Sequence, residues 1–153
     1  MTFSPVLPAS GTLGWSFLKR TSAAQQAALA KSPAIQRDAD YFRAKIGQIG
    51  TADQLVADRR LLRISLEAFG LEADVESRAF IRKVLAEGTL TTDAFAQRLA
   101  DPRYKALSAA FGFGDFSVPN TKLSDFPDKL IKQWQDRRFE SAVGTVNGDF
   151  RLA

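Results

Sequence analysis

The chain has 153 residues, of which 45% are hydrophobic and 25% charged, and this profile is typical of one soluble globular domain. It contains no cysteine and no histidine, which excludes structural zinc, iron–sulfur clusters, and Ser-His-Asp or Cys-His nucleophilic sites. The 21 Lys and Arg residues exceed the 17 Asp and Glu residues by only 4, too small an excess to indicate nucleic-acid binding by itself. We therefore expect a protein that is not an enzyme and that uses no cofactor and no metal.

The first 14 residues differ in composition from the rest of the chain. Pro5, Pro8, Gly11 and Gly14 stand among small polar residues, which predicts a flexible tail over 1–14. The segment lacks the order of a secretory signal peptide, and no apolar run reaches the roughly 18 residues of a membrane span. We expect a cytoplasmic protein, with export through a flagellar-type apparatus left open because it needs no cleavable signal.

Residues 15–153 are predicted to form a single all-α domain, because no segment shows the two-residue alternation of a half-buried strand. A first helix is expected from Trp15 to about Lys31. Ser32 and Pro33 begin the next one. It carries an apolar stripe of residues at steps of three and four, namely Ile35, Ala39, Phe42, Ile46 and Ile49.

The middle of the chain is predicted to contain a central, mostly buried helix over 58–69. Thr51 is expected to cap a short helix over 52–57, Asp58 to cap the central helix, and Gly70 to end it. Asp74 then begins a helix over 74–87. Its inward residues are predicted to be Val75, Ala79, Phe80, Ile81, Val84 and Leu85.

The last third of the chain is predicted to contain two shorter helices and one long one. Thr91 or Thr92 caps the first, and Asp101 with Pro102 begins the second. The loop over 113–120 folds its aromatic residues onto the core. A final helix begins near Ser124 or Asp125, and a five-residue step after Trp134 rotates its apolar stripe by about 140°. The chain ends without a cap, which would fit a polypeptide cut inside or just after a helix.

An internal repeat is the most informative pattern. A short helix, an Asp cap, an Arg two residues later, a longer helix and a Phe-Gly end occur over 56–71 and again, about 42 residues later, over 99–113. A period of this length is typical of helical pairs. We expect a compact helical array in which two such pairs are related by approximate two-fold symmetry.

Six residues are candidates for binding a partner protein. The arginines of the Asp-x-Arg pairs could clamp an anion. The structural alternative is that each aspartate simply caps the helix that follows it. Trp134 could anchor a partner or close the helical bundle. The candidates are Trp134, Arg60, Arg63, Arg103, Arg137 and Arg138.

Two other functions have weaker support. Three basic clusters on helices would bind DNA or RNA only if they converged on one surface, so nucleic acid is the less favoured partner. They are Arg59, Arg60 and Arg63; Arg78, Arg82 and Lys83; and Lys129, Lys132, Arg137 and Arg138. A carboxylate-only hydrolase would use Asp38 and Asp40, or the group Glu72, Asp74 and Glu76. Acidic residues near helix starts are, however, mostly solvated charges that complement the helix dipole.

The chain resembles an uncharacterised bacterial domain family that occurs mainly in alphaproteobacteria and is often encoded among flagellar genes. The resemblance spans nearly the whole chain. It is carried by Gly14-Trp15, Phe17-Leu18, Arg20-Thr21, Ser32-Pro33, Arg37-Asp38, Tyr41-Phe42, Leu61-Leu62, Ala68-Phe69-Gly70-Leu71, Phe80-Ile81, Lys83-Val84-Leu85, Glu87-Gly88-Thr89, Asp101-x-Arg103-Tyr104, Ala110-Phe111-Gly112-Phe113, Arg138-Phe139-Glu140, Ala142-Val143-Gly144 and Asn147.

The resemblance implies a cellular setting, because no activity, cofactor or catalytic residue is established for that family. The implied role is a non-catalytic accessory or structural component of flagellar assembly. Its partners would be proteins, with flagellar components among them. A flagellum-associated location, beside the cytoplasmic one, follows only from this resemblance.

Overall fold

The computed structural model describes residues 23–152, and their side chains as far as residue 141. All the regular secondary structure of this part of the chain is helical, as the sequence predicts. A first helix covers 23–30. The elements that follow are α2 (Pro33–Lys45), the 3₁₀ turn η1 (Ile46–Gln48), α3 (Ala52–Ala57), α4 (Arg59–Ala68), η2 (Glu72–Asp74), α5 (Arg78–Glu87), α6 (Phe95–Arg98), α7 (Pro102–Phe111), η3 (Asn120–Lys122) and α8 (Phe126–Leu152).

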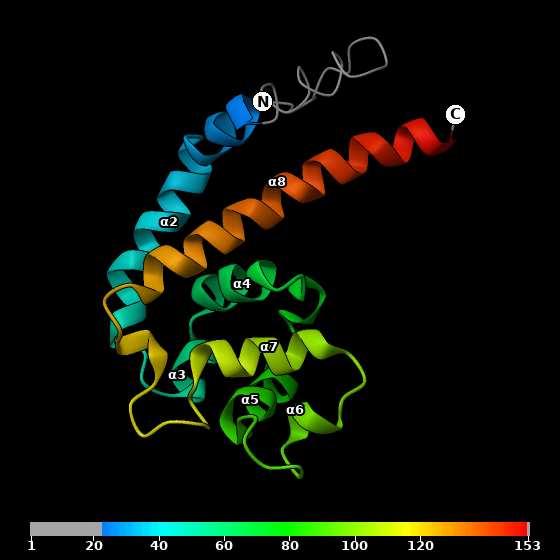
Figure 1. The fold of residues 1–153 in the computed structure, drawn as a ribbon. Helices are drawn as coiled ribbons and strands as arrows, with labels where there is room; N and C mark the ends of the chain where they lie inside the picture. Colours follow the sequence, from blue (N-terminus) through cyan, green and yellow to red (C-terminus); the bar gives the residue numbers. More distant parts are fainter. Residues whose placement is uncertain (1–22, 153) are drawn as a thin grey trace.

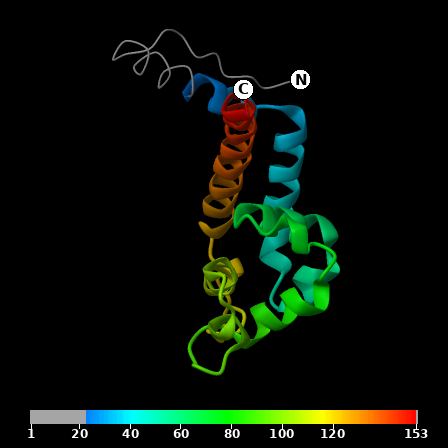
Figure 2. The same cartoon turned by 90° about the vertical axis from the view of Figure 1, so that its right-hand side faces the viewer.

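The helices form a compact lobe with two long helices leading away from it (Figure 1). The lobe contains α3 to α7. Both α2 and α8 pack beside it, and α8 lies across α4 before continuing beyond the lobe. Figure 2 shows α2 and α8 side by side, with both ends of the described chain on the same side of the molecule. The 27 residues of α8 make a rod of about 40 Å.

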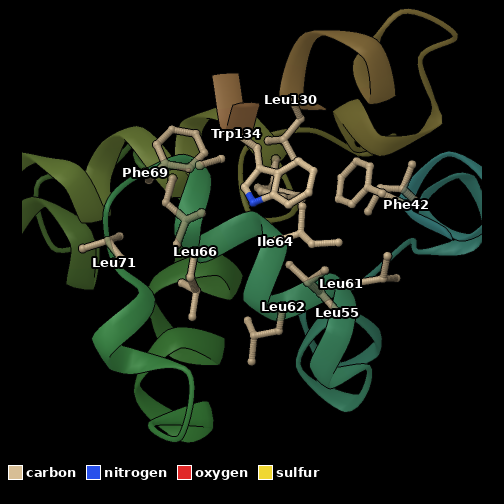
Figure 3. Close-up of a cluster of buried hydrophobic side chains, with 14 of the residues drawn as sticks. Phe42, Leu55, Leu61, Leu62, Ile64, Leu66, Phe69, Leu71, Leu130 and Trp134 are labelled. Carbon is tan, nitrogen blue, oxygen red and sulfur yellow. The ribbon is translucent and has the colours of Figure 1, made fainter. Parts of the chain in front are cut away.

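The core of the molecule lies where α8 crosses α4 (Figure 3). Trp134 of α8 is fully buried there, among Leu130 of its own helix, Phe69, Ile64 and Phe42. The predicted inward face of α2 is confirmed, because Ile35, Ala39, Phe42 and Ile46 are buried and Ile49 packs against the core. Helix α4 is the central helix that the sequence predicts.

Several helix boundaries follow from the local capping chemistry that the sequence indicates. Thr51 Oγ1 accepts the backbone N–H of Gln54 at 3.2 Å, and Asp58 Oδ1 accepts that of Leu61 at 3.0 Å. Asp101 Oδ1 caps α7 by accepting the backbone N–H of Arg103, two residues ahead, at 2.9 Å. The glycines that end α4, α5 and α7 have positive φ, which glycine adopts without steric cost.

Two predicted helix starts are wrong. Asp74 does not begin a helix, because its carboxylate accepts the hydroxyl of Tyr104 at 2.5 Å and the surrounding residues form η2; α5 begins only at Arg78. Neither Thr91 nor Thr92 caps α6. The side chain of Glu87 supplies this cap instead, because its Oε1 accepts the first backbone N–H of α6, that of Phe95, at 3.0 Å.

Two side-chain placements also differ from the prediction. Ala79 is exposed rather than inward, since α5 begins four residues later than expected and turns only Ile81, Val84 and Leu85 fully into the core. In the loop over 113–120, the ring of Phe113 stacks on that of Phe111, as expected. Phe116 remains 53% exposed.

The internal repeat stays a prediction. Helix pairs α3–α4 and α6–α7 share the capping aspartate and the terminal glycine, but two-fold symmetry between them is not established by these local similarities. The tail over 1–14, the first turns of the helix predicted from Trp15, and Trp15 itself lie outside the described residues. Side chains on the last turns of α8, where the rotated apolar stripe was expected, also lie outside them.

Candidate protein-binding groove

An open groove of about 770 Å³ lies between the middle of α8, the turn that follows α4, and the start of α7. The helix over 23–30 contributes one side of it, held to α8 by a hydrogen bond from Gln26 Nε2 to Asp136 Oδ1 at 2.7 Å. We call this feature the charged groove. Its lining residues are Leu29, Glu67, Gly70, Glu72, Arg103, Arg137, Arg138, Glu140 and Ser141.

Glu67 accepts hydrogen bonds from three residues that lie on two helices, α4 and α8. Its Oε1 accepts Arg63 Nη1 at 2.7 Å, and its Oε2 accepts both Trp134 Nε1 at 3.1 Å and Arg138 Nη1 at 3.0 Å. Partial burial raises the pKa of Glu67, but the hydrogen bonds from Arg63, Arg138 and Trp134 lower it by more. The carboxylate therefore stays ionised and holds α8 on α4.

A second carboxylate extends this network to α2. Asp38 accepts Arg60 Nε and Arg63 Nη2, each at 2.9 Å. Burial raises its pKa, but the hydrogen bonds and charges of Arg63 and Arg60 lower it by more, so the pKa of Asp38 also lies below its ordinary value. The side chain of Asp38 is only 18% exposed, so these pairs tie α2 to α4 more firmly than exposed surface ion pairs would.

Arg103 lies at the opposite wall of the groove. Its guanidinium donates twice to Asp101, and its Nη1 donates to the carbonyl oxygen of Gly70 at 2.7 Å. The hydrogen bonds from Arg103 lower the pKa of Asp101. One arginine thereby joins the start of α7 to the end of α4.

Arg137 approaches the same glycine from α8. A Cβ placed on Gly70 would lie 2.9 Å from Arg137 Nη1 and 3.3 Å from Arg103 Nη1, so both guanidinium groups reach one point. Among the described residues, no carboxylate forms an ion pair with Arg137.

The structure brings some of the predicted candidates together and separates others. Arg103, Arg137 and Arg138 line the charged groove, while Arg63 lies behind Glu67. Arg60 lies elsewhere, with its guanidinium carbon 4.5 Å from the centre of the Tyr41 ring.

Trp134 is not a surface anchor in this conformation. Its side chain is 0% exposed, so the structure corrects its proposed role as a partner-binding residue in favour of the alternative, packing in the core. The physical reason is that its ring fills the seam between α4 and α8, while its N–H is satisfied by Glu67.

Sequence reasoning missed the acidic half of the groove. Its three glutamates, Glu67, Glu72 and Glu140, are not among the residues that the sequence predicts to bind a partner. The Arg63–Glu67 spacing of four residues was a usable signal, since such pairs contact one another on a helix. The contact with Trp134 has no comparable signal, because it joins residues 67 positions apart.

The basic clusters are largely neutralised by neighbouring acids. Arg59 pairs with Glu76, and Arg82 with Asp53. Lys132 pairs with Asp136 of its own helix, and Lys129 pairs with Asp125, which directly precedes that helix. These pairs reduce the positive charge that the clusters could present to phosphate groups.

The acidic clusters likewise have structural roles. Asp38 binds two arginines, and Asp74 accepts the Tyr104 hydroxyl, whose pKa the hydrogen bond raises to about 12. The part of the chain that the structure describes contains no group of three acidic side chains placed to hold a metal ion. Nor does any helix there combine the length and apolar composition needed to cross a bilayer.

Comparisons with known proteins agree with this fold. The family model described as "Protein of unknown function (DUF1217)" matches residues 68–153, more than half of the chain. A crystal structure of a protein from Agrobacterium tumefaciens, a structural-genomics target, superposes with a TM-score of 0.79 at 30% sequence identity. The match covers 97% of this chain and 66% of that one, so the present chain spans about two thirds of its relative. No curated protein matches the sequence. On the family-model match, this chain belongs to the DUF1217 family of bacterial proteins of unknown function.

Proposed function

We propose that this protein binds another protein in the charged groove and acts as a non-catalytic accessory component of bacterial flagellar assembly. The observation that carries the binding role is the groove itself, which is open and lined by three arginines and three glutamates. A polypeptide carries both signs of charge and can pair with both. The charged groups of a nucleic acid are all phosphates, which the glutamates would repel.

A non-catalytic role is supported by the chemistry of the acids. A general acid that works near neutral pH needs a carboxyl group with a raised pKa. Here neighbouring arginines or lysines lower the pKa of Asp38, Glu67, Asp101 and Asp125. The flagellar setting rests on the resemblance of the sequence to proteins that are often encoded among flagellar genes.

The first test is an in-frame deletion of the gene, complemented by variants of the groove. Swimming is scored on soft agar, and filaments are counted in electron micrographs. We expect the deletion to reduce both, and wild type to restore them. Arg137→Glu should fail to restore them, because it reverses a groove charge that maintains no internal ion pair.

Lys105→Glu is the matched control. Lys105 is also exposed and without an acidic partner among the described residues, but it does not line the groove. It should restore swimming fully. Normal swimming in the deletion strain would refute the flagellar setting, and full restoration by Arg137→Glu would refute the groove as the binding surface. Circular dichroism of each purified variant checks that it folds.

The partner can be captured directly. A photo-crosslinking amino acid in place of Glu140 should join the protein to its partner in living cells, whereas the same group in place of Lys105 should not. Equal crosslinking from both positions would refute a localised interface. If the dominant crosslinked species were nucleic acid, with an affinity that falls steeply with salt, the alternative from the sequence would replace this proposal: a regulator that binds DNA or RNA through its basic helices.

A further inference from the structure

The geometry around Gly70 points to a specific ligand group: we infer that Arg103 and Arg137 together bind one carboxylate of the partner protein. This inference rests on the proposed function and adds the chemistry of recognition. It identifies which part of the charged groove selects a partner, and by what group.

The two guanidinium groups converge on one place. Arg103 Nη1 and Arg137 Nη1 lie 3.3 Å and 2.9 Å from the same point above Gly70, so the two nitrogens are at most 6.2 Å apart. They come from different helices, α7 and α8, and therefore meet only in the folded chain. Two like charges this close repel one another, and an anion bound between them would relieve the repulsion.

The convergence depends on glycine at position 70. Gly70 has a φ of +71° at the end of α4, where a residue with a side chain would be strained. A Cβ there would also meet both guanidinium groups. The absence of a side chain leaves the two arginines with a shared space that opens into the groove.

Only one of these two arginines has an ion-pair partner within the described residues. Arg103 has Asp101 as its partner, whereas Arg137 has no acid within ion-pair distance. Donors are also left over. A guanidinium has five N–H bonds; the described contacts of Arg103 use one on each of its three nitrogens and those of Arg137 use none. A planar carboxylate, which can accept two parallel N–H bonds, fits such a pair.

The surrounding acids favour a carboxylate over a phosphate. Glu72 and Glu140 line the same groove, and the charge of Glu72 acts on Arg103. A dianionic phosphate is repelled by these acids twice as strongly as a carboxylate, which offsets its doubled attraction to the arginines, and removing it from water costs more, so the planar carboxylate is favoured. The same acids can accept a lysine or arginine of the partner. We therefore expect the recognised segment to carry an acidic and a basic residue close together.

The test is an NMR titration of the full chain, with the arginine side-chain N–H signals observed in ¹⁵N-labelled protein. The probes are sodium acetate and inorganic phosphate, added at constant ionic strength with chloride as the balancing anion. Acetate should shift the Arg103 and Arg137 signals saturably with a millimolar dissociation constant. Phosphate should bind more weakly than acetate.

Variants make the assignment specific. Arg137→Gln should raise the dissociation constant for acetate at least fivefold, whereas Arg137→Lys, which keeps the charge but not the planar fork, should raise it less. Lys105→Gln should leave it unchanged. The inference is overturned if Arg137→Gln binds acetate as wild type does, or if phosphate binds more tightly than acetate.

The two proposals can fail separately. If Arg137→Gln loses acetate binding but still restores swimming, the carboxylate inference is wrong while the groove remains the candidate surface. If the deletion strain swims normally while acetate binds as expected, the anion site stands and the flagellar setting fails.

Discussion

The helix pairs α3–α4 and α6–α7 carry similar local signals in different surroundings. In each, an aspartate caps the longer helix and a glycine of positive φ follows its end. Yet six of the ten residues of α4 are buried and only three of the ten of α7. Helix α4 is covered by α8, whereas α7 packs mainly on α5 and α6. Similar sequence signals thus set where a helix begins and ends, but not how deeply it is buried.

The arginine that follows each cap shows the same contrast. Arg60 turns away from Asp58 and binds Asp38 on α2, so it joins two helices. Arg103 folds back onto Asp101, the cap of its own helix. The first arrangement stabilises the core network, and the second leaves an arginine at the groove.

The largest expected loss of stability comes from the side chain that holds α8 on α4, and it should exceed the loss from a contact of α7. Trp134→Ala removes the ring that packs α8 on α4 and should lower the free energy of unfolding by about 3–5 kcal/mol. Ser108→Ala removes the buried hydrogen bond from α7 to the carbonyl of Val84 and should cost about 1 kcal/mol. Urea denaturation followed by circular dichroism measures both, and equal losses would contradict the comparison.

The charge network at α4 should make stability depend on pH. Because the pKa values of Glu67 and Asp38 are lower in the folded chain than in the unfolded one, their contribution is complete above their ordinary values and is lost as the pH falls through the folded ones. Glu67→Gln should cost about 2–3 kcal/mol at neutral pH and flatten the acid side of the stability curve. If the stability of Glu67→Gln fell with acid pH as steeply as that of wild type, Glu67 would not be the source of the pH dependence.

The two caps should differ in strength. Asp58→Ala should lower the free energy of unfolding by about 1–2 kcal/mol, because Asp58 also accepts the hydroxyl of Tyr41 at 2.6 Å. Asp101→Ala should lower the free energy of unfolding by less, because the described partners of Asp101 are all atoms of the exposed Arg103. Thermal unfolding of the two variants side by side provides the measurement. A larger loss for Asp101→Ala would reverse the ranking.

The smallest effect is spectroscopic. The chain has two tyrosines, and each donates its hydroxyl to a carboxylate: Tyr41 to Asp58 and Tyr104 to Asp74. These hydrogen bonds raise both pKa values, that of Tyr104 to about 12. Absorbance at 295 nm should therefore show both tyrosine ionisation steps above pH 10, with that of Tyr104 the higher. Asp74→Asn should return one of the two steps toward that value.

Local signals account for what could be predicted from the sequence. Thr51, Asp58, Gly70 and Asp101 set helix ends through contacts a few residues away, and the stripe of α2 follows from its spacing. Asp74 failed as a helix start because its partner, Tyr104, is thirty residues away. The groove could not be predicted from the sequence for the same reason, because Arg103 of α7 and Arg137 of α8 meet beside Gly70 only in the folded chain.

The 67 residues that separate Trp134 from its partner Glu67 on α4 have a consequence for synthesis. A ribosome releases α4 long before it releases α8, so the face of α4 that the indole ring covers is left without its cover while the intervening residues emerge. The exposed leucines and isoleucine of that face would be a natural contact for chaperones during this interval. The packing of α8 on α4 joins residues far apart in sequence, which favours slow folding.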